Sequence, residues 1–451
     1  MDTSPKRKAI EASAFVLFGF GLSQVIRLAG NIALTRLLAP ELFGLLNIAR
    51  VFVVGIWLFS DIGLGPAIVR SERADEPVFL NTVWTLQVIR GGVISALCVI
   101  IAYPVSLVYK EPKLFLVVIA IGALEIPSAF LSTALPLLNK RLQQRRLTQM
   151  ELAIQCASLA CMIATAYFYR SVWALLLGEL LGNVIRLVWS HRINAECPNR
   201  FALEREAAKE VISFGKWILL STAMNFLATQ ADRMLLGKLF TLGWFGVYSV
   251  AINLAELPKQ VVSRLSSSVL FPLISSYARF PREELREKIR KPRGKILPLV
   301  ALGLALFSCF GDIAIRILYD QRYDAAAWML PILAIGMWPL VLVATVDGCL
   351  LSLGKPKFIA YGNLAKFLYM LVAIPLSFKL WSYKGAIAAV ALNDIPSYVI
   401  INYGLKKERL SFMKQDAWSS LVLAAATAAL LGARYALGLG FPGDPLHLFG
   451  R

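Results

Sequence analysis

Apolar stretches of about 20 residues recur along almost the whole chain, and no other sequence feature restricts the fold as strongly. A helix of about 20 apolar residues is long enough to cross the hydrocarbon core of a bilayer. The composition agrees, because 58% of the 451 residues are hydrophobic. The strands of a membrane barrel would be about 10 residues of alternating polarity, and the sequence lacks this alternation. The sequence therefore predicts an all-α polytopic membrane protein.

The apolar stretches predict 12 transmembrane helices and a candidate thirteenth. The candidate at 417–440 is weakened as a span by Gly432, Arg434 and Gly438. The other predicted spans are 13–37, 43–68, 79–108, 114–138, 147–169, 172–191, 211–238, 243–273, 296–319, 327–353, 357–380 and 384–404.

The formal net charge is +19, and in a soluble chain such an excess would indicate a nucleic-acid partner. Here Lys and Arg collect in alternate gaps between the apolar stretches, which is the pattern that orients helices in a membrane. Basic clusters lie at 6–8, 140–146, 279–295 and 406–409. A cytoplasmic N-terminus places all of these clusters on the cytoplasmic side. We therefore expect that orientation, and no nucleic-acid partner.

An internal repeat divides the predicted helices into two sets. The segment RLLAPELFGLLNIA at 36–49 matches KLFTLGWFGVYSVA at 238–251 in its leading cation, in a leucine, in a Phe-Gly pair and in its last alanine, at a constant offset of 202. Both segments join the first and second helices of a six-helix set. We expect two six-helix bundles, at 1–192 and 211–405, around a central cavity, as in alternating-access transporters. A cytoplasmic linker at 193–210 would join them, and 406–451 would hold a cytoplasmic segment and the extra helix.

Four arginines fall inside the predicted spans of the first bundle. Each ionisable group at the centre of a bilayer costs at least about 2.5–3.5 kcal/mol, so it should face a cavity, a partner or the interface. Arginine stays charged when it is buried and binds phosphate or carboxylate through its planar fork. We therefore expect a cationic, substrate-binding cavity for an anionic cargo, formed by Arg27, Arg50, Arg90 and Arg186. The alternative is that each arginine pairs with an acidic residue and only ties helices together.

Five carboxylates inside the predicted spans are candidates for coupling or gating. Asp61 precedes Gly63, Gly65 and Pro66, where the helix should loosen, and it could also have a structural role as an acceptor for freed backbone N–H groups. Glu256 and Asp394 could carry a proton or bind Na⁺, because desolvation favours the neutral form of a carboxyl group. The candidates are Asp61, Glu125, Glu256, Asp347 and Asp394.

Catalytic and metal-binding patterns are absent from the sequence. The two histidines, His191 and His447, have no metal-ligand partners at a suitable spacing. There is no glycine-rich phosphate loop of the kind that ATPases use. The predicted outer loops are only a few residues long, whereas membrane polymerases and glycosyltransferases tend to present a sizeable outer loop. We therefore expect no enzyme activity, no cofactor and no metal.

One block of the sequence resembles a known family. The stretch LTRLLAPELFGLLNIARVFVVGIWLFSDIGLGPAIVR at 34–70 resembles the opening signature of bacterial polysaccharide transporters, the Wzx-type lipid-linked oligosaccharide flippases of the MOP superfamily. The segment at 214–251, with Asp232, resembles the seventh span of that family. The resemblance extends over roughly 10–400 and is closest to exporters of colanic-acid or succinoglycan type.

The resemblance implies a multi-pass protein of the bacterial inner membrane with two helical bundles around a V-shaped cavity that alternates its opening. It implies a flippase that moves undecaprenyl-pyrophosphate-linked oligosaccharide repeat units from the cytoplasmic to the periplasmic leaflet, for exopolysaccharide or O-antigen synthesis. The implied partners are membrane lipids and the polysaccharide polymerase with its chain-length machinery. The alternatives are a lipid II flippase, which usually has fourteen spans, and a MATE-type antiporter, whose cationic drugs would not favour an arginine-rich cavity.

Overall fold

A computed structural model describes residues 5–444 of the chain, apart from 62, 72, 74–75, 141–142, 194–198, 267–269, 271–273, 275–276 and 278–279. Within these residues every regular element is a helix, which confirms the predicted all-α fold. Eight helical segments in the described part of the chain are long and apolar enough to cross a membrane. The chain is therefore a polytopic membrane protein, whereas the arrangement as two six-helix bundles stays a prediction.

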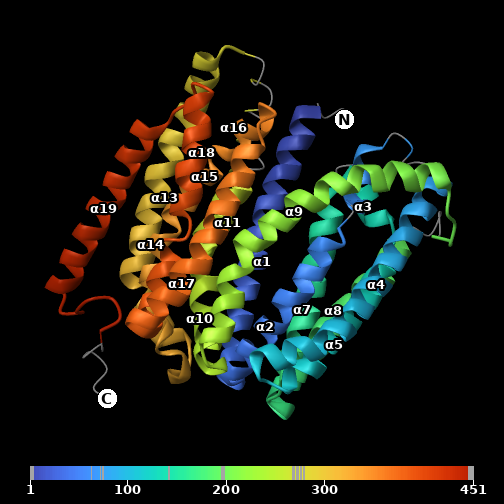
Figure 1. Cartoon of the computed structure of the whole chain (residues 1–451), viewed down its shortest axis with the longest axis horizontal. Coiled ribbons are helices and arrows are strands. Elements are labelled where there is room, and N and C mark those ends of the chain that lie inside the picture. Colours follow the sequence, from blue (N-terminus) through green and yellow to red (C-terminus); the bar gives the residue numbers. More distant parts are fainter. Residues whose placement is uncertain are drawn as a thin grey trace. The chain divides into compact units, whose positions relative to one another are not determined.

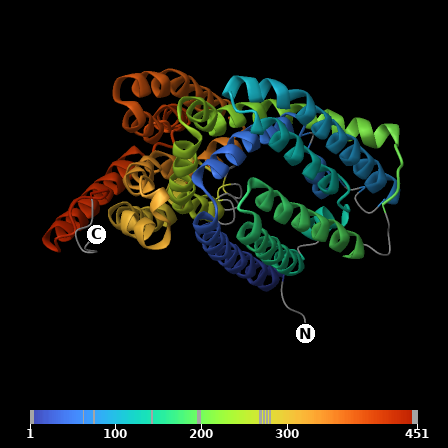
Figure 2. The same cartoon turned by 90° about the horizontal axis from the view of Figure 1, so that it is seen from below.

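The chain divides into two compact units, Met1–Phe226 and Leu227–Arg451. The units divide inside a helix, whereas the sequence placed the domain boundary in the linker at 193–210. The first unit contains α1 (Pro5–Leu37), α2 (Pro40–Phe59), α3 (Leu64–Arg70), α4 (Pro77–Tyr109), α5 (Lys113–Ala129), α6 (Ala134–Lys140), α7 (Gln144–Tyr169), α8 (Val172–Ile193) and the beginning of α9 (Arg205–Leu239). Within it, α4 packs on α5 (Figure 1), and α7 packs on both α8 and α1 (Figure 2).

The second unit contains the end of α9 and all later helices. These are α10 (Leu242–Ala255), α11 (Leu257–Leu265), α13 (Arg282–Leu318), α14 (Ala326–Gly336), α15 (Trp338–Ala344), α16 (Asp347–Ser352), α17 (Lys357–Ala391), α18 (Ile395–Lys407) and α19 (Met413–Ala436). A short 3₁₀ turn, Gln321–Tyr323, precedes α14. Helices α13 and α19 lie side by side (Figure 1), and α17 packs on α18.

Helix α19 is the predicted thirteenth span, and two buried ion pairs fix it to α13. Arg293 lies 2.5 Å from Asp416 near the start of both helices, and Arg434 lies 2.6 Å from Asp312 near their ends. The two helices therefore run parallel. Both arginines are fully buried, so each needs its carboxylate to compensate its lost hydration. The Arg434 that weakens this span in the sequence is thus a packing residue of α19.

The internal repeat is reproduced in the ends of the helices. α1 ends at Leu37 and α9 ends at Leu239, whereas α2 begins at Pro40 and α10 begins at Leu242. Each pair of ends differs by the 202 residues that separate the two sequence segments. The repeated Phe-Gly pairs are buried in both helices, so the repeat records a packing position that both units need.

Several predicted spans are broken into shorter helices. The span at 43–68 stops at Phe59 and resumes as α3 after Gly63, whose φ of 66° is a left-handed conformation that glycine adopts without strain. The loosening expected beside Asp61 is therefore confirmed. The span at 327–353 divides into α14, α15 and α16, and the one at 384–404 breaks at 392–394. Freed backbone groups at such breaks require partners inside the protein.

Candidate functional site

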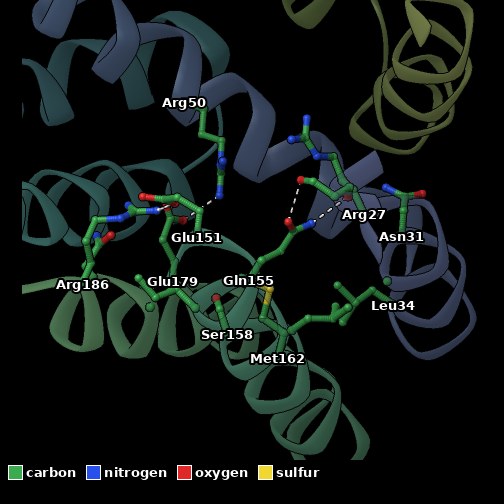
Figure 3. A pocket seen from close by; sticks show the side chains of 16 residues that line it. Arg27, Asn31, Leu34, Arg50, Glu151, Gln155, Ser158, Met162, Glu179 and Arg186 are labelled. Carbon is green, nitrogen blue, oxygen red and sulfur yellow. Dashed lines mark hydrogen bonds and ion pairs between the residues drawn. The ribbon is translucent and has the colours of Figure 1, made fainter. Parts of the chain in front are cut away.

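A cavity of about 550 Å³ lies within the first unit, between α1, α2, α7 and α8 (Figure 3). Its charged lining comes from all four helices: Arg27 from α1, Arg50 from α2, Glu151 from α7, and Glu179 with Arg186 from α8. Ser23, Asn31, Gln155, Ser158 and Asn183 supply neutral polar groups to the same lining. Four predicted spans thus turn their polar residues toward one shared space.

Small residues let the helices around the cavity approach closely. A Cβ atom on Gly30 would lie 2.4 Å from Cδ1 of Leu159, so a side chain at this position of α1 would displace the Leu159 side chain of α7. A Cβ atom on Gly178 would lie 2.7 Å from the backbone oxygen of Ser158. The Oγ of Ser158 donates to the carbonyl oxygen of Gly178 over 2.6 Å, which fixes α7 against α8.

Helix α1 is also held to α7 by a pair of hydrogen bonds at the edge of the cavity. The Oγ of Ser23 donates to Oε1 of Gln155 over 2.7 Å, and Nε2 of Gln155 donates to the carbonyl oxygen of Ser23 over 3.0 Å (Figure 3). This reciprocal pair fixes the orientation of the Gln155 amide. The position of Arg27, one turn further along α1, is therefore defined relative to α7.

Two of the three cavity arginines are paired with carboxylates. Nη2 of Arg50 lies 2.6 Å from Oε2 of Glu179, and Nη2 of Arg186 lies 2.5 Å from Oε2 of Glu151 (Figure 3). The Nε atoms of Arg50 and Arg186 are buried, and neither has a hydrogen-bond partner among the residues that the structure describes. Each guanidinium therefore keeps a free donor, and an unsatisfied buried donor costs about 1–3 kcal/mol.

Arg27 differs from the other two arginines of the cavity. It forms no ion pair with any residue that the structure describes, although it lines the same space. With three arginines and two glutamates, the lining carries a formal net charge of 3 − 2 = +1. The arrangement is suited to an anion that brings several oxygen acceptors, because in the described part of the chain one of these cations has no ion-pair partner and two more have unused donors.

Arg90 lies elsewhere and does not line this cavity. Its Nη2 donates to the carbonyl oxygen of Trp57 over 2.8 Å, its Nε donates to Oγ of Ser60 over 3.2 Å, and its guanidinium lies 4.9 Å from the Trp57 ring centroid. Nη1 of Arg90 is 3.9 Å from Oδ1 of Asp61. The same Oδ1 accepts the backbone N–H of Gly63 over 3.0 Å. Arg90 and Asp61 therefore stabilise the break between α2 and α3.

The carboxylates that pair with the cavity arginines are not those predicted. Glu125 lies in α5, outside the cavity lining, and forms no ion pair among the described residues. The sequence held a signal for Glu179, since a carboxylate inside an apolar span and seven residues before Arg186 lies on the same helix face. Glu151 lies near the beginning of its predicted span, so its pairing depends on how α7 and α8 pack.

The other candidate carboxylates belong to the second unit. Oδ1 of Asp394, at the break before α18, lies 2.6 Å from Nζ of Lys366 on α17. Glu256 lies 3.9 Å from Arg233. Asp347 begins α16 and its Oδ1 accepts the backbone N–H of Gly348 over 2.7 Å. These positions are all at helix ends, and a role of any of them in coupling stays a prediction.

Within the described ranges, no three metal-ligating side chains lie together. Nε2 of His191 is 2.9 Å from the carbonyl oxygen of Phe130, which is a structural contact. His447 lies outside the described residues.

Comparison with known proteins identifies the family to which the chain belongs. Residues 33–328 match the sequence profile of the family described as polysaccharide biosynthesis protein. The lipopolysaccharide biosynthesis protein WzxC of Escherichia coli is 22% identical over 353 residues, covering 76% of this chain and 66% of that protein. The succinoglycan biosynthesis transport protein ExoT of Rhizobium meliloti is 25% identical over 241 residues, covering 53% of this chain and 48% of that protein. The matched region is thus less than two thirds of either relative.

Solved structures share the fold at low sequence identity. The lipid II flippase MurJ, in an inward closed conformation, aligns with a TM-score of 0.72 at 10% identity, over 95% of this chain and 94% of that one. A multidrug-resistance MATE transporter of the MOP superfamily, in its inward-facing conformation, aligns with a TM-score of 0.66 at 12% identity, over 90% of this chain and 96% of that one.

Proposed function

Because the chain belongs to the polysaccharide biosynthesis protein family, within the MOP superfamily of membrane transporters, we propose that it flips undecaprenyl-pyrophosphate-linked oligosaccharides across the bacterial inner membrane. The direction is from the cytoplasmic to the periplasmic leaflet, and the product serves exopolysaccharide or O-antigen synthesis. The observation that carries this proposal is the cavity whose lining brings together Arg27, Arg50 and Arg186 from three apolar helices.

The pyrophosphate is the group of this substrate that needs the arginines. A pyrophosphate diester carries two negative charges, and moving it through the membrane interior uncompensated would be very costly. Arg27 has no ion-pair partner among the described residues, and Arg50 and Arg186 each have a buried Nε donor with no partner there. Arginine binds phosphate oxygens through two parallel N–H donors, so each of these groups can contribute direction as well as charge.

Glu179 and Glu151 act in this proposal as internal counter-ions. In the empty cavity they keep two arginines neutralised and oriented, and a bound pyrophosphate takes their place on the guanidinium groups. The volume of about 550 Å³ suits a pyrophosphate with its first sugars, since small-molecule sites span about 300–1,000 Å³. The polyprenyl chain remains in the bilayer, where its transfer has no cost.

Transport by alternating access requires the helices to change their arrangement around the bound head group. The break between α2 and α3, the breaks between α14, α15 and α16, and the break before α18 are places where helices can turn without disrupting long hydrogen-bonded segments. We expect rocking of the two units to expose the cavity to each side in turn. Residues 199–204, within the predicted linker, are hydrogen-bonded to the first unit.

Lipid II flipping is the second candidate, because MurJ shares the fold over almost the whole chain. Lipid II carries the same undecaprenyl pyrophosphate, so the arginines do not separate the two substrates. The family match favours oligosaccharide export. A drug antiporter agrees less well, because a cavity of net positive charge repels cationic drugs.

The test is transport of a lipid-linked oligosaccharide by the full-length protein in proteoliposomes. We expect Arg27→Ala, Arg50→Ala and Arg186→Ala each to reduce the initial rate, and the triple variant to abolish it. Arg192→Ala is the matched control, because this arginine is exposed on the same helix as Arg186 and lies outside the cavity. Wild-type rates in the triple variant, at normal protein abundance, would refute the proposal. Lipid II offered in parallel separates the two candidate substrates.

A further inference from the structure

A second positively charged hollow lies in the second unit, away from the cavity. It measures about 450 Å³ and is formed where α13 and α19 begin. Arg286, Arg290 and Lys291 come from the first turns of α13, and Lys414 comes from the first turn of α19. The proposed transport mechanism makes no use of these residues.

Most of the charge in this hollow is uncompensated. Nε of Arg290 lies 2.9 Å from Oε2 of Glu287, one turn earlier on α13. Arg286, Lys291 and Lys414 form no ion pair with any described residue. Three cations therefore surround a concave space without a carboxylate partner in the described part of the chain. Such a concentration of like charge attracts an anion from solution or from the membrane surface.

The start of α19 adds to this attraction. Its N-cap residue, Phe412, makes no side-chain capping bond, and the helix dipole places a partial positive charge at this end of the helix. Ser411, next to it, contributes a hydroxyl group to the lining. A helix N-terminus combined with cations from a neighbouring helix is a favourable setting for a phosphate group.

The hollow is also rigidly built. Gln415 lines it, donates through Nε2 to the carbonyl oxygen of Arg290 over 2.9 Å, and accepts through Oε1 from Nη1 of Arg293 over 3.2 Å. Arg293 is fully buried against Asp416, and its guanidinium lies 5.3 Å from the Phe412 ring centroid. The two helices therefore hold their cations at a fixed separation without any ligand.

Exposed apolar side chains on α19 indicate where a membrane would meet this end of the unit. Met413 is 53% exposed and Trp418 is 63% exposed, and tryptophan favours the boundary between headgroups and acyl chains. Lys414 lies one turn before Trp418, so a membrane boundary at Trp418 would bring lipid headgroups to the hollow. The predicted orientation makes this the cytoplasmic surface, where anionic lipids bind basic hollows between helices.

We propose that this hollow binds the phosphate headgroup of an anionic phospholipid, with the acyl chains of that lipid along α19 beside Trp418. The arrangement of Arg286, Lys291 and Lys414 around the uncapped start of α19 carries the proposal. Such a lipid fixes the α13–α19 pair at the membrane surface. This inference is independent of the substrate that the cavity transports.

The experiment measures lipid binding to the purified full-length protein in detergent by native mass spectrometry, with phosphatidylglycerol and with phosphatidylcholine. Each cation near a membrane surface strengthens binding of an anionic lipid by about fivefold. The variant Arg286→Gln/Lys291→Gln/Lys414→Gln is therefore expected to bind phosphatidylglycerol on the order of 100-fold more weakly. The control, Lys406→Gln/Lys407→Gln, removes exposed charge at the end of α18, outside the hollow.

The outcomes separate a specific site from general attraction to a basic surface. The proposal requires wild-type and control proteins to prefer phosphatidylglycerol, and the triple variant to lose that preference. Equal binding of both lipids by the wild type, or equal losses in the triple variant and the control, would overturn it. A third arm adds free inorganic phosphate. If millimolar phosphate displaces the lipid completely, the occupant is a soluble anion and the lipid assignment is wrong.

Discussion

Replacement of Glu179 by glutamine should strengthen the binding of an anion in the cavity and slow its release. Oε2 of Glu179 lies 2.6 Å from Nη2 of Arg50, and a bound pyrophosphate has to exchange with this carboxylate. Glutamine keeps an oxygen that can accept from Arg50 but removes the negative charge. The formal charge of the lining rises from +1 to +2.

The expected change in anion affinity depends on how exposed the Arg50–Glu179 ion pair is. A hydrogen bond to a charged group contributes about 1.5–3 kcal/mol. The side chains of Arg50 and Glu179 are 42% and 30% exposed, so the lower end of that range applies. A gain of about 1.4 kcal/mol corresponds to a tenfold tighter complex. We therefore expect Glu179→Gln to bind the lipid-linked pyrophosphate about tenfold more tightly.

Titration calorimetry with undecaprenyl pyrophosphate measures the affinity, and the proteoliposome assay measures turnover. Tighter binding with a lower maximal rate is the expected combination, because release from the cavity then becomes slower. Glu41→Gln is the matched control, since Glu41 is exposed at the start of α2, the helix that carries Arg50. A folded Glu179→Gln protein with unchanged or weaker affinity would refute the idea of an internal counter-ion.

Three further predictions concern the framework of the protein. Asp416→Ala leaves the buried Arg293 without its carboxylate, so we expect the free energy of unfolding to fall by about 3–5 kcal/mol. The loss should be measurable as a lower unfolding temperature. An unchanged temperature would contradict the packing role of the pair. Gly30→Ala places a methyl group against Leu159 and should lower the free energy of unfolding by about 1–3 kcal/mol. Adding Leu159→Ala to the same chain should restore the stability. If it does not, the contact between Gly30 and Leu159 is not the cause of the loss. Asn199→Ala removes the hydrogen bonds that Asn199 makes with Ser132 and Thr133. Limited proteolysis should therefore cut the variant near 199–204 faster than it cuts the wild type. Equal cleavage rates would mean that these bonds do not hold the linker.

The sequence was sufficient for the main features of the fold. The apolar stretches predicted the helices, and the repeated Phe-Gly segments predicted the matching helix ends in the two units. The sequence could not show which side chains compensate Arg434, because Asp312 lies 122 residues earlier in the chain. A residue that looked unfavourable for a span is therefore part of the contact between α13 and α19.

The arginines of the candidate site could be predicted from the sequence, whereas the glutamates that pair with them were much harder to predict. Arginines are conspicuous in an apolar span, and three of the four predicted arginines line one cavity. Arg90 also lies inside an apolar span, but its side chain points from α4 toward the end of α2, where Nη2 donates to the carbonyl oxygen of Trp57. The pairing of Arg186 with Glu151 joins two helices, so it depends on packing that no local pattern encodes.

Photo-crosslinking tests most directly whether the arginine-lined cavity receives the lipid-linked head group. A photoreactive amino acid is placed at Met162, which lines the cavity, or at Leu180, which is exposed on α8 and lies outside the cavity lining. We predict that labelled undecaprenyl-pyrophosphate oligosaccharide crosslinks at Met162 and not at Leu180, and that Arg27→Gln/Arg50→Gln abolishes the product. Equal labelling at both positions, or labelling at Met162 that survives the loss of both arginines in a folded protein, would contradict the account.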